Sequence, residues 1–141
     1  MHHVLLVEPD DDFCLSLREE LVHVGCRLTI VGTFAEAIAA VRGVDDIDNI
    51  ITDAALPDGS GLVLAQDFRK LGKPVFVLRE QRGRTVVYDR NGTAFLGDRM
   101  AVGQFLAAAL LAQPEPAPTR RNNPNDTKGR ARRARRVPRL Q

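Results

Sequence analysis

Largely apolar residues along the chain form short runs that alternate with longer stretches of helical spacing. The runs cover residues 4–7, 28–31, 49–53, 74–78 and 93–96. Short continuous runs of this kind are typical of strands that are buried on both faces of a parallel sheet. The pattern therefore predicts five buried strands.

Amphipathic patterns separate most of these runs. The predicted helices cover residues 13–24, 37–41, 62–71 and 102–112. Thr33 and Glu36 have the spacing of a capping box, which supports a helix start at this point. Strands that alternate with helices favour a parallel sheet with helices on both faces.

One interval between two predicted strands lacks a helical pattern. Residues 83–92 carry no apolar stripe, and residues 85–88 are β-branched or aromatic. Asn91 and Gly92 form a dipeptide that is a strong hairpin-turn signal. We therefore expect an extra strand or an extended loop here, in place of a regular helix.

The charges divide the chain into two parts. Residues 1–113 contain 16 acidic and 11 basic side chains, whereas residues 114–141 contain 2 acidic and 9 basic ones. Prolines 114, 116 and 118 disrupt a helix and favour an extended spacer. The sequence predicts one domain over residues 1–113, followed at 114–141 by a proline-rich linker and a basic, disordered tail.

Apolar segments long enough to cross a membrane are absent from the sequence, since no run approaches the roughly 18 residues required. The first residues also lack the basic segment and the apolar stretch of a secretory signal. We therefore expect a cytoplasmic protein without a membrane span.

Carboxylates close two of the predicted strands. Glu8 follows the first strand and Asp53 ends the third, and the carboxyl ends of parallel strands are where functional groups gather in such sheets. Asp10, Asp11 and Asp12 make the first loop strongly anionic. Crowded carboxylates favour a hard divalent cation such as Mg²⁺, although these three aspartates are also explained by capping of the first helix.

The apolar and turn blocks resemble those of two-component response-regulator receiver domains. The resemblance spans roughly residues 3–112 and rests on residues 4–8, 50–53, 56–61 and 74–78. It implies an α/β flavodoxin-like fold, with a doubly wound five-stranded parallel sheet in the order 2-1-3-4-5. It also implies a phosphorelay signalling module, not an enzyme.

The resemblance assigns roles to individual residues. Asp53 is the implied phosphoacceptor, which receives a phosphoryl group from a sensor histidine kinase or a phosphotransfer protein. The implied metal ligands for Mg²⁺ are Glu8, Asp53 and Ala55, and Asp10 is an alternative if the first loop bends differently.

Three departures from the family pattern make this an atypical, degenerate receiver. Pro9 stands where the family has a second acidic residue, Arg79 where it has serine or threonine, and Asp98 where it has lysine. Loss of that cation should weaken phosphoryl binding. Arg79 or Arg99 could supply a replacement charge, because guanidinium pairs well with phosphate.

Two other functions remain open at this point. The chain could be a phosphorylation-independent pseudo-receiver that binds a protein partner, or forms a homodimer through the fifth strand and the last helix. The tail could also bind nucleic acid or another anionic surface, or simply remain solvated. Its candidate contact residues are Arg130, Arg132, Arg133, Arg135 and Arg136.

Overall fold

A six-stranded sheet forms the centre of the protein in a computed structural model, which describes residues 1–43 and 46–116. The strands lie in the order β2-β1-β3-β6-β7-β8. Their bounds are β1 (His3–Val7), β2 (Arg27–Val31), β3 (Asn49–Asp53), β6 (Val75–Gln81), β7 (Arg84–Asp89) and β8 (Gly92–Gly97). The first four strands in this order are parallel, whereas β7 is antiparallel to both of its neighbours.

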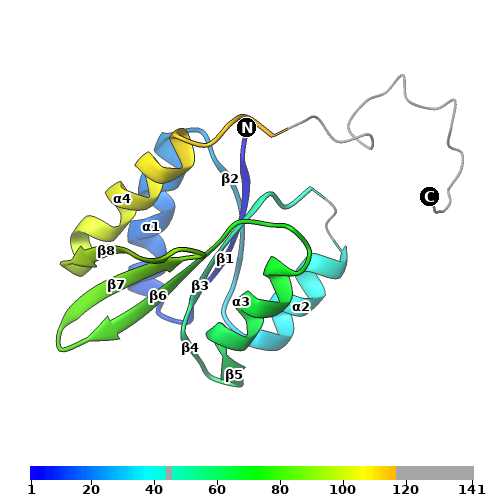
Figure 1. Cartoon of the computed structure of the whole chain (residues 1–141), viewed down its shortest axis with the longest axis horizontal. Helices are drawn as coiled ribbons and strands as arrows, with labels where there is room; N and C mark the ends of the chain where they lie inside the picture. Colours follow the sequence, from blue (N-terminus) through cyan, green and yellow to red (C-terminus); the bar gives the residue numbers. More distant parts are fainter. Residues whose placement is uncertain (44–45, 117–141) are drawn as a thin grey trace, which may run out of the picture.

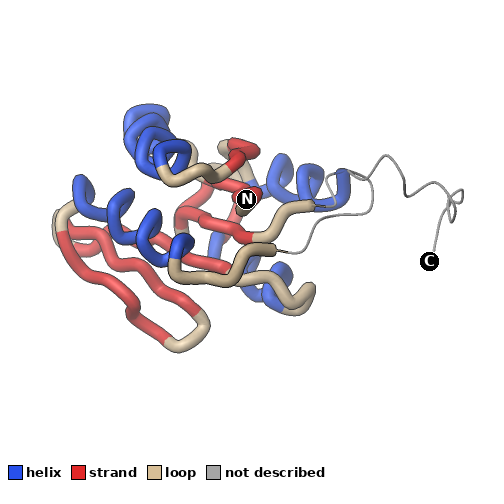
Figure 2. The backbone as a smooth tube through the Cα atoms, turned by 90° about the horizontal axis from the view of Figure 1, so that it is seen from above, coloured by secondary structure: helices blue, strands red, loops and turns tan. Residues whose placement is uncertain are grey.

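Two pairs of helices enclose the sheet (Figures 1 and 2). They are α1 (Asp11–His23), α2 (Phe34–Gly43), α3 (Gly61–Arg69) and α4 (Arg99–Leu111). Helices α1 and α4 share one apolar core with the sheet, and α2 and α3 share a second core on the opposite face. A short ribbon of β4 (Ala55–Leu56) and β5 (Gly59–Ser60) leads into α3.

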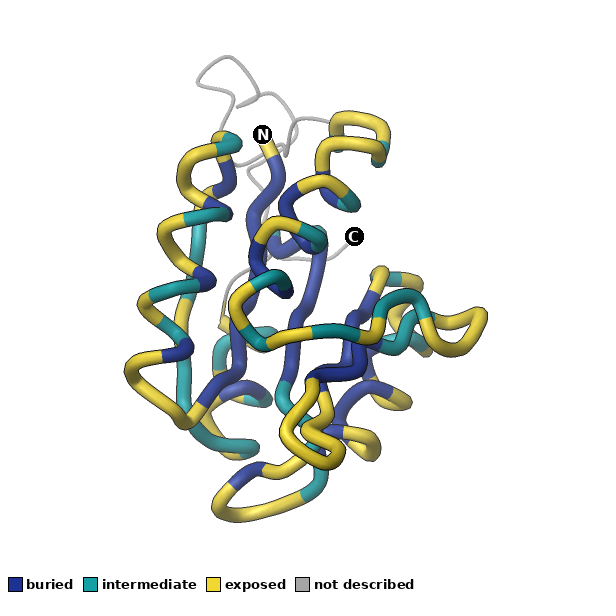
Figure 3. The backbone as a smooth tube through the Cα atoms, turned by 90° about the vertical axis from the view of Figure 1, so that its left-hand side faces the viewer, coloured by how far each residue is buried: buried dark blue, intermediate teal, exposed yellow. Residues whose placement is uncertain are grey.

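Burial explains why the central strands have continuous apolar sequences. All five residues of β1 are buried, and Figure 3 shows the middle of the sheet as its most enclosed part. Successive residues contribute to opposite cores: Leu6 packs toward α1 and α4, while Leu5 and Val7 pack toward α2 and α3. A strand that contributes to two cores has no solvent-facing positions for polar side chains.

Capping interactions fix the beginnings of α1 and α2. Asp10 Oδ1 accepts a hydrogen bond from the backbone N–H of Phe13 at 3.1 Å. The backbone N–H of Glu36 donates to Thr33 Oγ1 at 3.1 Å, and Glu36 Oε1 accepts from the Gly32 N–H at 3.1 Å. These bonds satisfy donors that a helix start otherwise leaves without partners. The helix start predicted from Thr33 and Glu36 is confirmed.

Strand β7 occupies the interval in which the sequence lacks a helix. It forms one hairpin with β6 and another with β8. Arg82, Gly83 and Gly92 have positive φ angles, as tight hairpin turns require. The flavodoxin-like fold and the replacement of this helix are confirmed. The five expected strands are present and run in one direction, and the β-branched segment adds a sixth, antiparallel strand between the fourth and the fifth.

The end of α4 agrees with the proline pattern of the sequence. This helix ends at Leu111, shortly before Pro114 and Pro116. The predicted basic tail falls on residues 117–141, which lie outside the described residues. Among the helices of the described part, none is long and apolar enough to cross a membrane.

Candidate functional site

Glu8 and Asp53 lie side by side at the carboxyl edge of the parallel strands. Strands β1 and β3 pair in register with Val7 opposite Thr52, so the residues that follow are neighbours. Both carboxylates line a hollow of about 130 Å³. The other lining residues are Pro9, Asp10, Phe13, Leu78, Arg79, Glu80, Thr85 and Arg99. The sheet therefore brings together the two strand-end carboxylates that the sequence singles out.

Glu8 is a nearly inaccessible carboxyl group, with 3% of its surface exposed. Its Oε2 accepts a hydrogen bond from the Asp10 N–H at 3.0 Å, whereas its buried Oε1 has no partner among the described residues. Burial, together with the neighbouring charge of Asp53, raises the pKa of Glu8 from 4.5 to about 8. Without a bound metal ion, Glu8 therefore holds a proton at neutral pH.

Asp53 is half-buried and is oriented by the loop that follows it. Its Oδ1 accepts a hydrogen bond from the Ala55 N–H at 2.8 Å. The backbone of this loop is tied back to α3, because the Gly61 N–H donates to the Ala54 carbonyl at 2.9 Å. The carboxylate is thus held at the rim of the hollow by backbone contacts that do not depend on flexible side chains.

The raised pKa of Glu8 predicts a pH-dependent stability in EDTA. The unfolded chain loses the Glu8 proton near pH 4.5, whereas the folded protein keeps it up to about pH 8. The folded state binds more protons in this window, so the free energy of unfolding should fall as pH rises through it. Urea unfolding at several pH values should show a smaller fall for Glu8→Gln than for wild type.

Glu19 provides the matched control for this measurement, because it is an exposed glutamate on α1. Glu19→Gln should keep the wild-type pH dependence. An equally steep fall in wild type and Glu8→Gln would show that the Glu8 carboxyl does not hold its proton in the folded protein.

Asp10 is already engaged on both of its oxygens. Besides capping α1, its Oδ2 accepts a hydrogen bond from Arg99 Nη2 at 2.6 Å. The Phe13 N–H and then the Arg99 guanidinium hold the pKa of Asp10 below its ordinary value. The structure therefore favours the cap for Asp10 over the alternative role as a metal ligand.

Arg99 brings a cation into the hollow from the first residue of α4. Its guanidinium lies 4.1 Å from the centre of the Phe13 ring, and its Nη1 is 4.0 Å from Glu80 Oε1. An aromatic face and two carboxylates hold the guanidinium in place. Its charge acts on Glu8, where it lowers the pKa against the effect of burial.

Arg79 and Asp98, two of the positions at which the sequence departs from the family pattern, lie in different places relative to the hollow. Arg79 lines the hollow and is exposed, whereas Asp98 does not belong to the lining residues. Asp98 is the residue that precedes α4, and its side chain makes no cap hydrogen bond. The expected negative charge therefore stays outside the hollow, and the next residue, Arg99, enters it.

Sequence reasoning missed Thr85, Glu80 and Phe13 as members of this site. Thr85 lies on β7 opposite Glu80 and is 3% exposed. It shares a sheet face with Val87, which packs in the core beneath α1 and α4. The β-branched pattern of residues 85–88 predicts a strand but gives no register, and the register is what places Thr85 in the lining of the hollow.

Comparison with solved structures identifies the family. The non-phosphorylated HemR receiver domain from Leptospira biflexa is 32% identical in sequence, with a TM-score of 0.53. The match covers 59% of this chain and 68% of that domain. This chain belongs to the response-regulator receiver family. The receiver resemblance inferred from its sequence blocks is thereby confirmed.

Two more distant structures share the fold of this receiver. A CheY-like response regulator receiver domain from Methanospirillum hungatei JF-1 is 23% identical in sequence, with a TM-score of 0.54. The match covers 57% of this chain and 66% of that domain. A sensor protein from Polaromonas sp. JS666 is also 23% identical, with a TM-score of 0.52 and the same coverages. Searches with family models and among curated proteins found no match.

The receiver's hollow offers oxygen ligands that suit Mg²⁺. Within residues 1–43 and 46–116, no three histidine, cysteine, aspartate or glutamate side chains form a metal-binding group. A site would therefore rest on Glu8 and Asp53, with the Ala55 carbonyl as the third predicted ligand. The unpartnered Glu8 Oε1 beside Asp53 fits a hard cation that keeps several waters. Magnesium binding stays a prediction.

Proposed function

We propose that this receiver is a phosphorelay module in which Asp53 accepts a phosphoryl group from a sensor histidine kinase or a phosphotransfer protein. The main support is the meeting of Asp53, Glu8 and Arg99 in one hollow. A half-buried carboxylate fixed by backbone contacts is well placed to react. We expect the exchange to take place in the cytoplasm.

Charge balance supports Arg99 as the group that compensates for the missing family lysine. A phosphoryl group adds negative charge beside Glu8 and Asp53. A guanidinium pairs strongly with phosphate oxygens, and Arg99 already contacts carboxylates at this site. The substitutions at Pro9, Arg79 and Asp98 would then weaken the phosphoryl site without removing it.

The proposed transfer uses the chain's own carboxylate as nucleophile. An oxygen of Asp53 forms a bond to phosphorus as the bond from phosphorus to the donor's imidazole nitrogen breaks. The nitrogen keeps the electron pair and takes up a proton. Bound Mg²⁺ would neutralise charge on Glu8, Asp53 and the phosphoryl oxygens, and the Ala55 N–H holds the Asp53 carboxylate in position.

Labelling with a small phosphodonor tests this proposal. Incubation of the full chain with acetyl phosphate and Mg²⁺ should add one phosphoryl group, detected by intact-protein mass spectrometry, and Asp53→Asn should remain unmodified. Asp12→Asn is the matched control, because Asp12 is an exposed aspartate near the same loop. It should label like wild type. Absence of label in all three proteins, or label in Asp53→Asn, would reject Asp53 as phosphoacceptor.

A phosphorylation-independent interaction module is the second candidate function. Its support is the altered edge of the sheet, where Leu96 of β8 and Met100 of α4 are exposed by 51% and 81%. This is the region of the homodimer that the sequence left open as an alternative. Sedimentation should then show a dimer whose affinity is unchanged in Asp53→Asn, and a monomer at all concentrations would remove the dimer from this proposal.

Binding of nucleic acid by the basic tail stays a separate prediction. Its residues fall within 117–141, outside the described part of the chain. Deletion of residues 119–141 should abolish any salt-sensitive DNA or RNA binding by the full chain. Binding that survives the deletion would exclude the tail as its source.

A further inference from the structure

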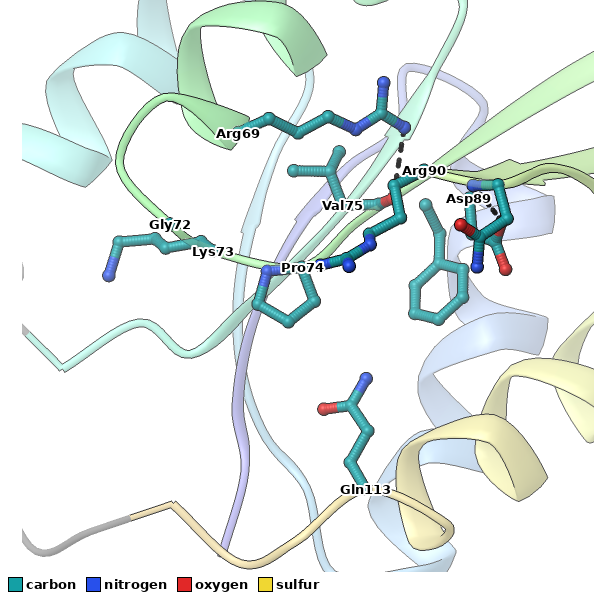
Figure 4. Close-up of a pocket in the computed structure, with 10 residues that line it drawn as sticks. Arg69, Gly72, Lys73, Pro74, Val75, Asp89, Arg90 and Gln113 are labelled. Atoms are coloured by element: carbon teal, nitrogen blue, oxygen red, sulfur yellow. Dashed lines mark hydrogen bonds between the residues drawn. The ribbon is translucent and has the colours of Figure 1, made fainter.

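A second hollow lies at the other end of the parallel strands, away from Asp53. It is formed where β6 begins and β7 ends, close to the ends of α3 and α4 (Figure 4). Its volume is about 350 Å³, much larger than the 130 Å³ of the Asp53 hollow. That size falls within the range of about 300–1,000 Å³ found for small-molecule sites.

Arg69 presents an incompletely used guanidinium to this hollow. Its Nη2 donates a long hydrogen bond of 3.4 Å to the Val75 carbonyl, while its Nε is buried and has no partner among the described residues. A buried donor without an acceptor costs free energy that an anionic ligand would recover. The protein itself therefore satisfies the Arg69 guanidinium only in part.

The charge around the hollow also favours an anion. Arg90 is exposed and lines the same space, and Figure 4 shows its guanidinium turned toward Pro74. The one acidic lining residue, Asp89, uses its Oδ1 to accept the Asn91 N–H at 2.7 Å. Lys73 adds positive charge, although its Nζ already donates to the Ile47 carbonyl at 2.6 Å.

Apolar and amide groups complete the site. Pro74 is exposed and offers an apolar ring against which a flat ligand ring can pack, beside the largely buried Phe76. The side-chain amide of Gln113 faces this space from beyond the end of α4 (Figure 4). Amides supply both donors and acceptors, which suits the polar edge of a heterocycle.

We propose that this hollow binds a phosphorylated ring compound of mononucleotide size. Arg69 and Arg90 contact the phosphate, because guanidinium nitrogens match its oxygens in geometry and charge. The ring packs on Pro74, and Gln113 contacts its polar edge. This ligand is independent of the phosphoryl group proposed for Asp53, since the two hollows share no lining residue.

An NMR titration of the full chain tests the inference, with AMP, GMP, CMP and UMP as probes. At least one of them should shift the amide signals of residues 72–76 and 89–91 saturably. The parent nucleoside and inorganic phosphate should each bind at least about tenfold more weakly, because each lacks one half of the ligand. Asp53→Asn should bind as wild type does, which separates this result from the proposed function.

Arg90→Gln supplies the decisive variant, since Arg90 is exposed and its loss should leave the fold intact. It should weaken mononucleotide binding by about tenfold or more. Arg84→Gln is the matched control, because Arg84 is an exposed arginine of β7 outside this hollow. Equal loss in both variants, equal binding of phosphate alone, or shifts confined to residues 117–141 would overturn the proposal.

Discussion

Replacement of Arg99 by alanine should lower the affinity of this receiver for beryllofluoride, a phosphoryl mimic, by about a hundredfold in Mg²⁺. Arg99 is one of two basic residues that line the Asp53 hollow, and it contacts Asp10 and lies close to Glu80. At about 4 Å and an effective dielectric near 20, one charge contributes about 4 kcal/mol. Screening at this partly exposed side chain reduces the loss to about 2–3 kcal/mol. Isothermal titration calorimetry measures the affinity.

Arg79→Ala is the comparison that makes the Arg99 result specific. Arg79 also lines the hollow, but it lies on the exposed end of β6. Strand alternation turns Arg79 to the face opposite Leu78, which packs toward α1 and α4. Its loss should therefore weaken beryllofluoride binding by only about threefold, as expected of an exposed charge that solvent and salt screen. A larger effect of Arg79→Ala than of Arg99→Ala would show that Arg79, and not Arg99, is the compensating cation.

Replacement of Gly61 by alanine should lower the free energy of unfolding by about 3 kcal/mol or more. A Cβ at Gly61 would lie 1.9 Å from the Asp53 carbonyl oxygen and 2.9 Å from Ala54 Cα. These are backbone atoms of the strand and loop that hold the Asp53 carboxylate, so no side-chain rotation relieves the clash. Urea or thermal unfolding should show the loss directly.

Gly43→Ala is the control for this effect. Gly43 is the last residue of α2, and a Cβ there meets nothing within 4 Å. The substitution should leave stability unchanged or raise it by about 0.5–1 kcal/mol, because alanine favours a helix over glycine. If Gly61→Ala proved as stable as Gly43→Ala, α3 would not approach the Asp53 loop as closely as described.

Much of the fold could be predicted because local sequence determines it. The continuous apolar run of β1 and the run that ends at Asp53 follow from burial on two faces. The helix start at Thr33 and Glu36 follows from hydrogen bonds within one turn. The turn at Asn91 and Gly92 indicated a hairpin, so the loss of a helix was also foreseeable. Each of these features depends on residues that are close in sequence.

The composition of the site was harder to predict because it depends on register and on contacts distant in sequence. Alignment alone put Asp98 at the position of the family cation, whereas the geometry at the start of α4 directs Arg99 into the hollow. Arg99 and Asp10 are 89 residues apart in sequence, so no local sequence pattern predicts their pairing. Thr85 joins the site only because β7 pairs with β6 in one particular register.

A crystal structure grown with Mg²⁺ and beryllofluoride would test most directly whether this hollow is a phosphoryl site. Our account predicts the beryllofluoride attached to an oxygen of Asp53, with the Arg99 guanidinium turned from Asp10 toward the fluorine atoms and the metal held by Glu8 and Asp53. Clear density for an unmodified Asp53, with Arg99 still paired to Asp10 at saturating beryllofluoride, would contradict it.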